Sequence, residues 1–291
     1  MNCNLTAKLP AWFKQELPDE KSLRMIRLLS EFGIKSVCQE ARCPNLPSCF
    51  RNGKAAFLIL GSICTRDCSF CAVNKAKNTG ILDEAEPERI RDLVRILGLN
   101  YVVITSVTRD DLPDAGANIF ARSIELIHSL NGNIIVEVLI PDFQGKISSL
   151  KCVLDASPGV LAHNIETVNR LYPFLRPQAN YLLSLTVLSK SKELRPDIDT
   201  KSSIMLGLGE TEAEIIKTMQ DLRANQCDIL TLGQYLAPSI RHYPVKKFIG
   251  IEDFQRYQEI GRGLGFKAIF SGPLVRSSYC AEQVYRSMAH A

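Results

Sequence analysis

The sequence predicts an α/β fold in which a parallel sheet closes, fully or partly, into a barrel. Two observations carry this prediction: short apolar runs typical of buried strands, and amphipathic helical segments that alternate with them. The chain has 291 residues, 46% of them hydrophobic and 23% charged, so it is long enough to bury one barrel-sized core. Repeated strand-then-helix units connect through right-handed crossovers, which align the strands in parallel.

Eight segments have the length and the apolar, β-branched content of buried strands. They are residues 55–61, 101–107, 133–140, 159–162, 181–188, 203–208, 228–232 and 267–270. Helices are predicted over residues 86–97, 117–130 and 252–264. A further helix begins at Thr211, because Thr211 and Glu214 have the spacing of a capping box.

Polar side chains follow several strands at the point where each one ends, at residues 62–65, 105–106, 163–166 and 207–210. Any one of these segments is more typical of a turn or a helix cap. In α/β barrels, however, the chemistry takes place at the C-terminal ends of the strands. Together the four segments therefore predict one functional rim.

Composition and charge argue against several classes of protein. The net charge is +4, but Lys and Arg are spread along the chain, which gives little support to nucleic-acid binding. The longest apolar stretch, near residues 55–60, is far shorter than the roughly 20 residues of a membrane helix. The first residues lack a signal-peptide core, so we expect a cytoplasmic protein. Six of the ten cysteines lie within residues 38–71, which favours metal or redox chemistry over disulfides.

Cys64, Cys68 and Cys71 lie within eight residues, directly after the first predicted strand. A cubane iron-sulfur cluster normally takes four thiolates, so three leave one iron free for another ligand, such as an amino-acid chelate. A CxxC redox pair or half of a zinc site would explain Cys68 and Cys71 alone. The position of Cys64 makes a cluster the stronger interpretation.

A second set, Cys38, Cys43 and Cys49, lies upstream, with spacings that match no common zinc knuckle. Pro44 and Pro47 bend this segment, so three sulfurs can converge on one cluster. Ordinary buried cysteines are the alternative interpretation.

The CxxxCxxC spacing, with Phe70 before the last cysteine, resembles the radical S-adenosylmethionine (SAM) superfamily. The resemblance implies that Cys64, Cys68 and Cys71 hold a 4Fe-4S cluster whose open iron binds the amino and carboxylate groups of SAM. Reductive cleavage would then give a 5'-deoxyadenosyl radical, and Phe70 would pack near the cofactor.

Both cysteine sets together resemble the lipoyl synthase family, and the similarity runs nearly end to end. Matching stretches are residues 40–45, 101–106, 109–112, 141–143, 162–167, 200–202, 206–210, 233–236 and 276–279. The resemblance implies a partial (β/α)6-type TIM barrel over residues 53–265. An N-terminal extension, 1–52, and a C-terminal extension, 266–291, would carry an auxiliary cluster.

In that family the upstream cysteines hold an auxiliary 4Fe-4S cluster, and the first serine of the Arg-Ser-Ser-Tyr motif supplies its fourth ligand. That serine is Ser277 here. Chemistry alone would favour Cys280, because iron-sulfur iron prefers a soft thiolate to a hydroxyl oxygen. A weak oxygen ligand nevertheless suits a cluster that must open to surrender sulfide.

The resemblance also implies the reaction: two sulfur atoms, taken from the auxiliary cluster, are inserted at C6 and C8 of a protein-bound octanoyl-lysine. Thr105, Asn164 and Glu166 are the expected polar contacts to SAM. The implied partners are octanoylated lipoyl carrier domains, on 2-oxoacid dehydrogenase E2 subunits and the glycine cleavage H protein, with flavodoxin or ferredoxin as reductant. Rival interpretations are another sulfur-inserting or methylthiolating radical SAM enzyme and a zinc-stabilised, non-catalytic binding protein.

Overall fold

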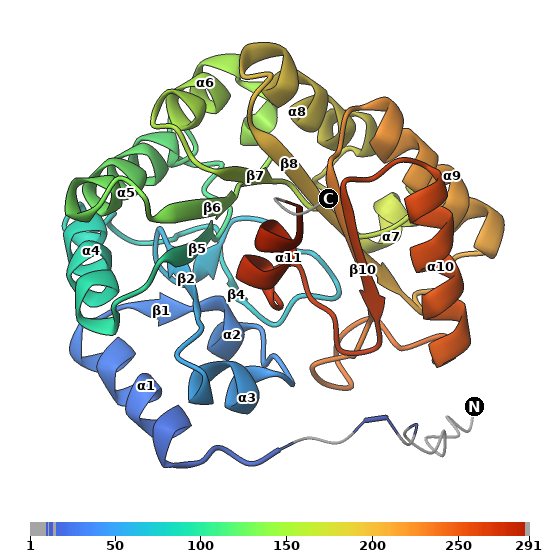
Figure 1. The fold of residues 1–291 in the computed structure, drawn as a ribbon, viewed down its shortest axis with the longest axis horizontal. Helices are drawn as coiled ribbons and strands as arrows, with labels where there is room; N and C mark the ends of the chain where they lie inside the picture. The colour runs from blue at the N-terminus through green and yellow to red at the C-terminus, as the bar shows by residue number, and fades with distance from the viewer. Residues whose placement is uncertain (1–9, 11, 14–15, 289–291) are drawn as a thin grey trace.

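The computed structural model describes residues 10, 12–13 and 16–288, and most of them form a ring of strands enclosed by helices (Figure 1). Residues 1–9 of the predicted N-terminal extension and residues 289–291 of the C-terminal one lie outside the described residues. Within the described part, the main sheet has eight strands in the order β1-β2-β5-β6-β7-β8-β9-β10. They are β1 (Lys35–Ser36), β2 (Ala56–Ile59), β5 (Tyr101–Ser106), β6 (Ile135–Leu139), β7 (Val160–Ala162), β8 (Asp199–Leu206), β9 (Ile229–Gln234) and β10 (Ala268–Gly272).

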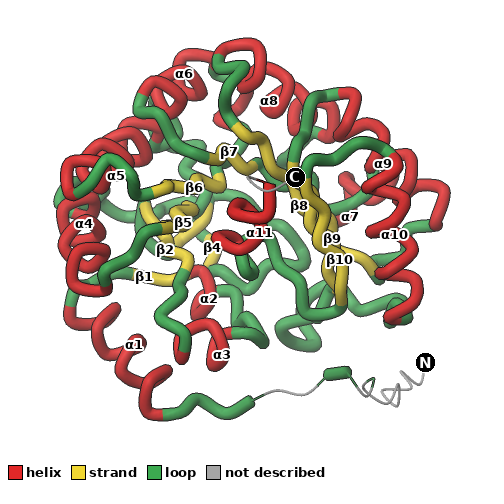
Figure 2. Tube along the Cα trace, in the orientation of Figure 1, coloured by secondary structure: helices red, strands yellow, loops and turns green. Residues whose placement is uncertain are grey.

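The strands from β2 to β10 all pair in parallel, and only β1 pairs antiparallel, with β2. Each parallel strand except β10 is followed by a helix of the outer layer, as Figure 2 shows. These helices are α4 (Glu86–Leu97), α5 (Ala117–Leu130), α6 (Ile147–Asp155), α8 (Tyr181–Leu194), α9 (Glu212–Ala224) and α10 (Ile251–Gly263). The predicted α/β barrel is confirmed: six strand-helix units lead to a seventh parallel strand, and β1 and β10 form the two edges of an open barrel.

Four further helices and a two-stranded sheet lie outside the six strand-helix units. Helices α1 (Glu20–Glu31), α2 (Val37–Glu40) and α3 (Leu46–Arg51) precede the barrel, and α7 (Tyr172–Leu175) follows β7. Strands β3 (Ile63–Cys64) and β4 (Asn74–Lys75) pair in parallel outside the main sheet. The capping box predicted at Thr211 and Glu214 is present at the start of α9.

One predicted strand was wrong, because residues 181–188 belong to helix α8. Asn180 begins the helix, since its side-chain oxygen accepts a hydrogen bond from the backbone N–H of Leu183 at 2.9 Å. Burial then repeats with the helical period, at Tyr181, Ser184, Leu185 and Leu188. A short apolar run fits a buried strand and a buried helix equally well, so periodicity alone did not separate them.

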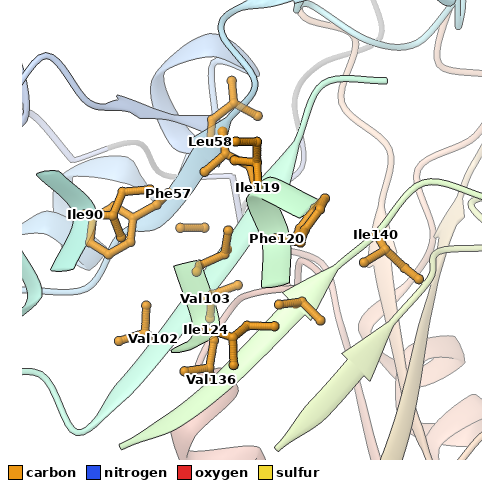
Figure 3. Packing of buried hydrophobic residues seen from close by; sticks show 14 of the residues in the cluster. Phe57, Leu58, Ile90, Val102, Val103, Ile119, Phe120, Ile124, Val136 and Ile140 are labelled. Atoms are coloured by element: carbon orange, nitrogen blue, oxygen red, sulfur yellow. The ribbon is translucent and has the colours of Figure 1, made fainter. Parts of the chain in front are cut away.

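Strand alternation divides the buried residues into an outer and an inner set. In Figure 3, Val102 on β5 and Val136 on β6 lie close to Ile124 of α5, while Phe57 on β2 lies against Ile90 of α4. Successive side chains of a strand point to opposite faces, so Tyr101, Val103 and Thr105 share the inner face. This inner face lines the interior of the barrel.

Helix α11 (Ala281–Met288) lies in the centre of the ring of strands (Figure 1). Its Val284 packs against the first residues of three strands: Val160, Ile229 and Ala268. The ring of Tyr285 lies 5.8 Å from that of Tyr101, at the start of β5. Helix α11 therefore closes the end of the barrel at which the strands begin.

A buried ion pair crosses the interior of the barrel. Lys201 on β8 donates to both carboxylate oxygens of Glu137 on β6, at 2.7 and 3.0 Å, and each side chain is only 1% exposed. The hydroxyl of Tyr101 donates to the same carboxylate at 2.6 Å. Two charges buried away from water are stable only when they form an ion pair with each other. Lys201, Glu137 and Tyr101 therefore fix β8, β6 and β5 relative to one another.

Replacing Lys201 by methionine should destabilise the fold by about 3–5 kcal/mol, because it leaves the Glu137 carboxylate buried without its cation. Urea denaturation of the anaerobically purified protein measures this loss. Lys151→Met is the matched control, since Lys151 is 59% exposed and pairs with Asp155 at the surface. That variant should lose less than about 1 kcal/mol. Equal losses in the two variants would contradict the role given to the buried pair.

Candidate active site

The CxxxCxxC segment forms a compact loop at the C-terminal end of β2. Cys64 lies on the short strand β3, opposite Lys75 of β4, and the backbone N–H of Cys71 donates to the carbonyl of Cys68 at 3.2 Å. The backbone N–H of Arg66 points at the sulfur of Cys64, 3.4 Å away. The three cysteines therefore lie together on the rim where the sequence predicted them.

Burial and the neighbouring thiolates favour the protonated thiols of Cys68 and Cys71. Burial raises the pKa of Cys68, and it raises that of Cys71 to about 11, with the neighbouring thiolates adding to both shifts. The guanidinium of Arg176 acts in the opposite direction on Cys68. Thiolates crowded in this way require a multivalent cation, which is the chemistry that an iron-sulfur cluster provides.

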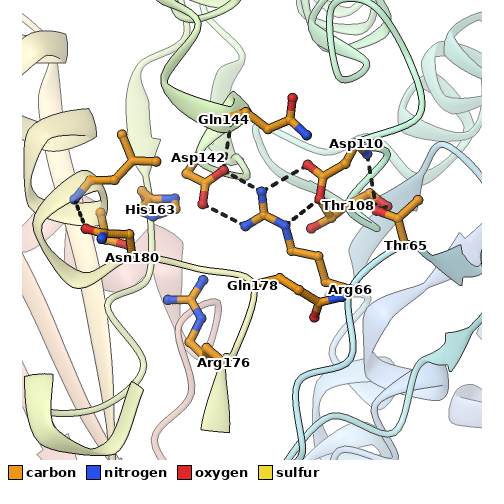
Figure 4. A network of polar contacts seen from close by, with 12 residues as sticks. Thr65, Arg66, Thr108, Asp110, Asp142, Gln144, His163, Arg176, Gln178 and Asn180 are labelled. Atoms are coloured by element: carbon orange, nitrogen blue, oxygen red, sulfur yellow. Dashed lines mark hydrogen bonds and ion pairs between the residues drawn. The ribbon is translucent and has the colours of Figure 1, made fainter. Parts of the chain in front are cut away.

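Arg66, inside the motif, ties the loop to two other strand ends (Figure 4). Its guanidinium donates to Asp110, after β5, at 2.7 and 2.9 Å, and to Asp142, after β6, at 2.6 and 2.7 Å. Burial opposes the charge of Arg66, but the bonds to both carboxylates outweigh it and raise its pKa. The planar, five-donor guanidinium suits two carboxylates at once, so Arg66 positions the loop.

We expect Arg66→Lys to reduce the iron held at this loop, because one ammonium group cannot make forked bonds to two carboxylates. The carboxylate of Asp142, which is only 1% exposed, would lose part of the ion pairing that stabilises its buried charge. Iron content should be measured in protein whose upstream cysteines are replaced by alanine, so that only this site is counted. Arg195→Lys is the control, because Arg195 makes a similar forked pair with Asp197 at the surface. Equal iron contents in the two variants would refute the positioning role.

Several polar atoms at this rim are buried and have no hydrogen-bond partner among the described residues: Ser106 Oγ, His163 Nε2 and Arg176 Nε. His163 is 2% exposed, and burial lowers its pKa to about 4, so the ring is neutral. Its Nδ1 lies 2.9 Å from the carbonyl of Ile140, which assigns the proton to Nδ1 and leaves Nε2 as an acceptor. Buried polar atoms without partners fit a polar ligand, because such atoms are normally satisfied.

The predicted SAM contacts lie on the same rim. Thr105 is the penultimate residue of β5, and its hydroxyl donates to the carbonyl of Leu139 at 3.1 Å. Asn164 donates to the carboxylate of Glu166 at 2.9 Å, and Glu166 has a left-handed backbone with φ 65°. Burial raises the pKa of that carboxyl group. Phe70 packs against a cluster of buried residues that includes Leu208 and Tyr235.

Arg176 is the rim residue that sequence reasoning missed. It follows α7 in a loop without a motif, and its guanidinium donates to the carbonyls of Asn164 and Ile165 at 3.0 and 3.3 Å. It also lies 5.2 Å from the ring centre of Tyr172. Only the fold brings this cation to the cysteines, because more than 100 residues separate Arg176 from Cys68 along the chain.

The upstream cysteines lie at the opposite end of β2. Strand β1 runs antiparallel to β2, with Ser36 opposite Phe57, so the chain continues from Ser36 towards the start of β2. Cys38 and Cys49 therefore lie beside the residues that lead into this strand, and the backbone N–H of Lys54 donates to the carbonyl of Cys49 at 2.9 Å. The two cysteine sets occupy opposite ends of one barrel strand.

A cavity of about 500 Å³ adjoins the upstream set. Cys38, Cys43 and Cys49 line it, together with the inner-face residues Tyr101 and Val103 and residues 278–283 from the C-terminal segment. Arg276 and Lys54 also line the cavity, and their charges lower the pKa of Cys43 and of Cys49 respectively, against the effect of burial. Burial raises the pKa of Cys43, and raises that of Cys49 to about 12, with the other thiolates adding to both shifts. A cavity of this size that is lined by thiols fits a cluster.

Ser277 lies beside this cavity, and its hydroxyl donates to Asn164 at 3.0 Å. The residues of the C-terminal segment that line the cavity are Arg276, Ser278, Tyr279 and Cys280, together with those that begin α11. Ser277 therefore connects the rim that carries Asn164 to the segment that borders the upstream cysteines. Its role as an iron ligand stays a prediction.

Within the described residues, no three Cys, His, Asp or Glu side chains converge as closely as a single metal ion requires. The thiolates of a cubane bind different irons, so they do not share one ion. In the same part of the chain, none of the helices combines the length and the apolar character needed to span a bilayer.

Two solved structures share the fold at low sequence identity. The hydrogenase maturase HydG matches 73% of this chain and 50% of its own, with a TM-score of 0.56 and 17% identity. Methylornithine synthase PylB matches 96% of this chain and 93% of its own, with a TM-score of 0.53 and 15% identity. These similarities concern the fold alone.

Sequence comparison defines the family. Residues 58–222 match the radical SAM superfamily. Lipoyl synthase from Caldanaerobacter subterraneus subsp. tengcongensis is 51% identical over 96% of this chain and 97% of its own. Lipoyl synthases from Thermus thermophilus and Aquifex aeolicus are each 50% identical, over 95% and 92% of this chain and 86% and 97% of their own. With cysteine sets at both ends of its barrel and half of its residues shared with these enzymes, the chain belongs to the lipoyl synthase family of the radical SAM superfamily.

Proposed function

We propose that the chain acts as a lipoyl synthase, inserting two sulfur atoms at C6 and C8 of an octanoyl group held in amide linkage on a carrier lysine. The observation that carries this proposal is the pair of cysteine sets at opposite ends of β2, with the polar interior of the barrel between them. This arrangement suits an octanoyl chain held between the two sites, because each carbon that loses hydrogen to the radical must then reach the sulfur.

Radical SAM enzymes use a 4Fe-4S cluster and SAM, and Cys64, Cys68 and Cys71 are the residues we assign to that cluster. When bound and reduced, the cluster supplies the electron that cleaves SAM to a 5'-deoxyadenosyl radical. The residues around the cluster would bind SAM and orient it. Arg176 offers a half-buried cation for the carboxylate of SAM, and Ser106 and His163 offer polar atoms that lack partners among the described residues.

Thr105, Asn164 and Glu166 are our proposed polar contacts to the rest of SAM. Asn164 and Glu166 hold each other by a hydrogen bond of 2.9 Å, so their side chains are oriented before any ligand arrives. Phe70 would cover an apolar part of the cofactor from the loop itself. Such prior orientation reduces the entropy lost when a ligand binds.

We assign the auxiliary 4Fe-4S cluster to Cys38, Cys43 and Cys49, with Ser277 as the fourth ligand. When bound there, this cluster supplies the inserted sulfur. The cavity, the thiols and the half-buried Arg276 support the assignment, because the guanidinium balances part of the thiolate charge of Cys43.

The barrel interior must exclude water and oxygen, since a primary carbon radical reacts with any nearby C–H bond. Helix α11 closes the end where strands begin, through Val284 and Tyr285. The substrate would therefore enter from the other end, beside the CxxxCxxC loop. Its carriers would be the octanoylated domains of 2-oxoacid dehydrogenase E2 subunits and the glycine cleavage H protein, with a flavodoxin or ferredoxin as reductant.

An anaerobic assay tests the proposal, with an octanoyl-lysine peptide, SAM and dithionite, and mass spectrometry of the peptide. We expect the peptide to gain two sulfur atoms and two SAM molecules to be consumed for each product. A peptide with unmodified lysine is the control. SAM cleavage without sulfur in the octanoyl peptide would refute lipoyl synthesis but keep the radical SAM assignment.

A further inference from the structure

A fourth thiol shares the cavity of the upstream cysteines. Cys280 lines it together with Cys38, Cys43 and Cys49. Its thiolate is among the charges that Cys49 experiences, alongside those of Cys38 and Cys43. Four thiols around one cavity match the number that a cubane cluster takes.

The backbone fixes Cys280 at this position. It lies directly before α11, and its carbonyl accepts a hydrogen bond from the backbone N–H of Val284 at 3.0 Å. Its φ is 52°, in the left-handed region that a residue with a Cβ rarely adopts. The turn that begins at Arg276, where the N–H of Tyr279 donates to the carbonyl of Arg276 at 3.0 Å, holds this conformation. Strain of this kind is typically found where a side chain has a function.

Ser277, the proposed oxygen ligand, is engaged elsewhere in the same structure. Its hydroxyl donates to the side-chain oxygen of Asn164 at 3.0 Å, on the rim. The side chain of Cys280 contacts only its chain neighbour Tyr279 by a hydrogen bond among the interactions described for it, and a thiolate suits iron-sulfur iron better than a hydroxyl oxygen. The two side chains therefore fit two different states of one site.

We propose that Cys280 is a second ligand for the fourth iron of the auxiliary cluster, bound while the hydroxyl of Ser277 is bonded to Asn164. This inference rests on the proposed function. When Ser277 replaces Cys280, the serine oxygen gives up its proton and the thiolate of Cys280 takes one up, so no net proton or electron is exchanged. The thiolate state would protect the cluster between turnovers, and the serine state would expose it to the substrate.

The test uses the full chain with Cys64, Cys68 and Cys71 replaced by alanine, so that only the auxiliary cluster assembles. ⁵⁷Fe is incorporated anaerobically, and Mössbauer spectra report the ligand of each iron without any measurement of activity. Cys280→Ser keeps the size and backbone of the residue and changes only its ligand atom. Cys152→Ser, on the outer helix α6, is the matched control.

We expect Ser277→Ala to keep four irons and an unchanged spectrum. Cys280→Ser should convert one of the four irons to an oxygen-ligated site, whereas Cys152→Ser should change nothing. A normal spectrum in Cys280→Ser, together with loss of the fourth iron in Ser277→Ala, would overturn the role of Cys280 and leave the proposed function intact. A parent protein that assembles no cluster at all would overturn both.

Discussion

Cys68→Ala should abolish the cleavage of SAM. Cys68 lies in the middle of the CxxxCxxC loop, where its carbonyl accepts a hydrogen bond from the N–H of Cys71 and its backbone is held by Lys75 at 2.8 Å. With two thiolates left, the cluster loses one of the three bonds that hold it and cannot keep one iron open for SAM. The variant should form no 5'-deoxyadenosine with dithionite, and chromatography of the reaction mixture measures this.

Cys152→Ala is the control for this variant. Cys152 lies on α6 at the outside of the barrel, where its thiol donates to Asn118 at 3.3 Å. The Cys152→Ala enzyme should cleave SAM at the same rate as the enzyme without substitutions. If Cys68→Ala still produces 5'-deoxyadenosine, the loop after β2 is not where SAM reacts.

Cys43→Ala should separate the two halves of the reaction. Cys43 belongs to the upstream set and borders the cavity at the other end of β2. Its loss removes a thiolate from the auxiliary site but leaves the CxxxCxxC loop unchanged. We expect 5'-deoxyadenosine to form, and the octanoyl peptide to gain no sulfur, when both products are measured in one anaerobic reaction.

The two variants should therefore give different patterns in the same assay: Cys68→Ala makes neither product, and Cys43→Ala makes only 5'-deoxyadenosine. A Cys43→Ala enzyme that still inserts two sulfurs would contradict the sulfur-donor role of the auxiliary site. A Cys43→Ala enzyme that also fails to cleave SAM would show that the two sites are not independent.

Local signals predicted most of the fold. The helix starting at Thr211 has its capping box, and the boundaries 86–97 and 117–130 coincide with α4 and α5. Residues 181–188 were wrongly predicted to be a strand, because the order of apolar and polar side chains in this short run does not distinguish a strand from a helix. The structure shows a helix that begins after Asn180, whose side chain caps it. Tertiary packing, which the sequence does not display, decides such short apolar runs.

In the candidate site, too, local patterns predicted some residues and only the fold brings others together. Spacing and the preceding strand predicted Cys64, Cys68 and Cys71 as cluster ligands, because three cysteines within eight residues are a local pattern. Arg176 was not predicted, and neither was the pair of Lys201 with Glu137, because these contacts join strands and loops far apart in the chain. The antiparallel turn of β1, which brings Cys38 to the start of β2, is likewise a property of the fold and not of any motif.

The central claim is that the two cysteine sets divide the reaction between a radical site and a sulfur source. The most direct test is a single anaerobic turnover of enzyme whose clusters were assembled with ³⁴S-labelled sulfide, given an octanoyl-lysine peptide, SAM and dithionite in a medium containing unlabelled sulfide. The claim predicts a product in which both inserted sulfur atoms carry the label. A product with unlabelled sulfur would contradict it.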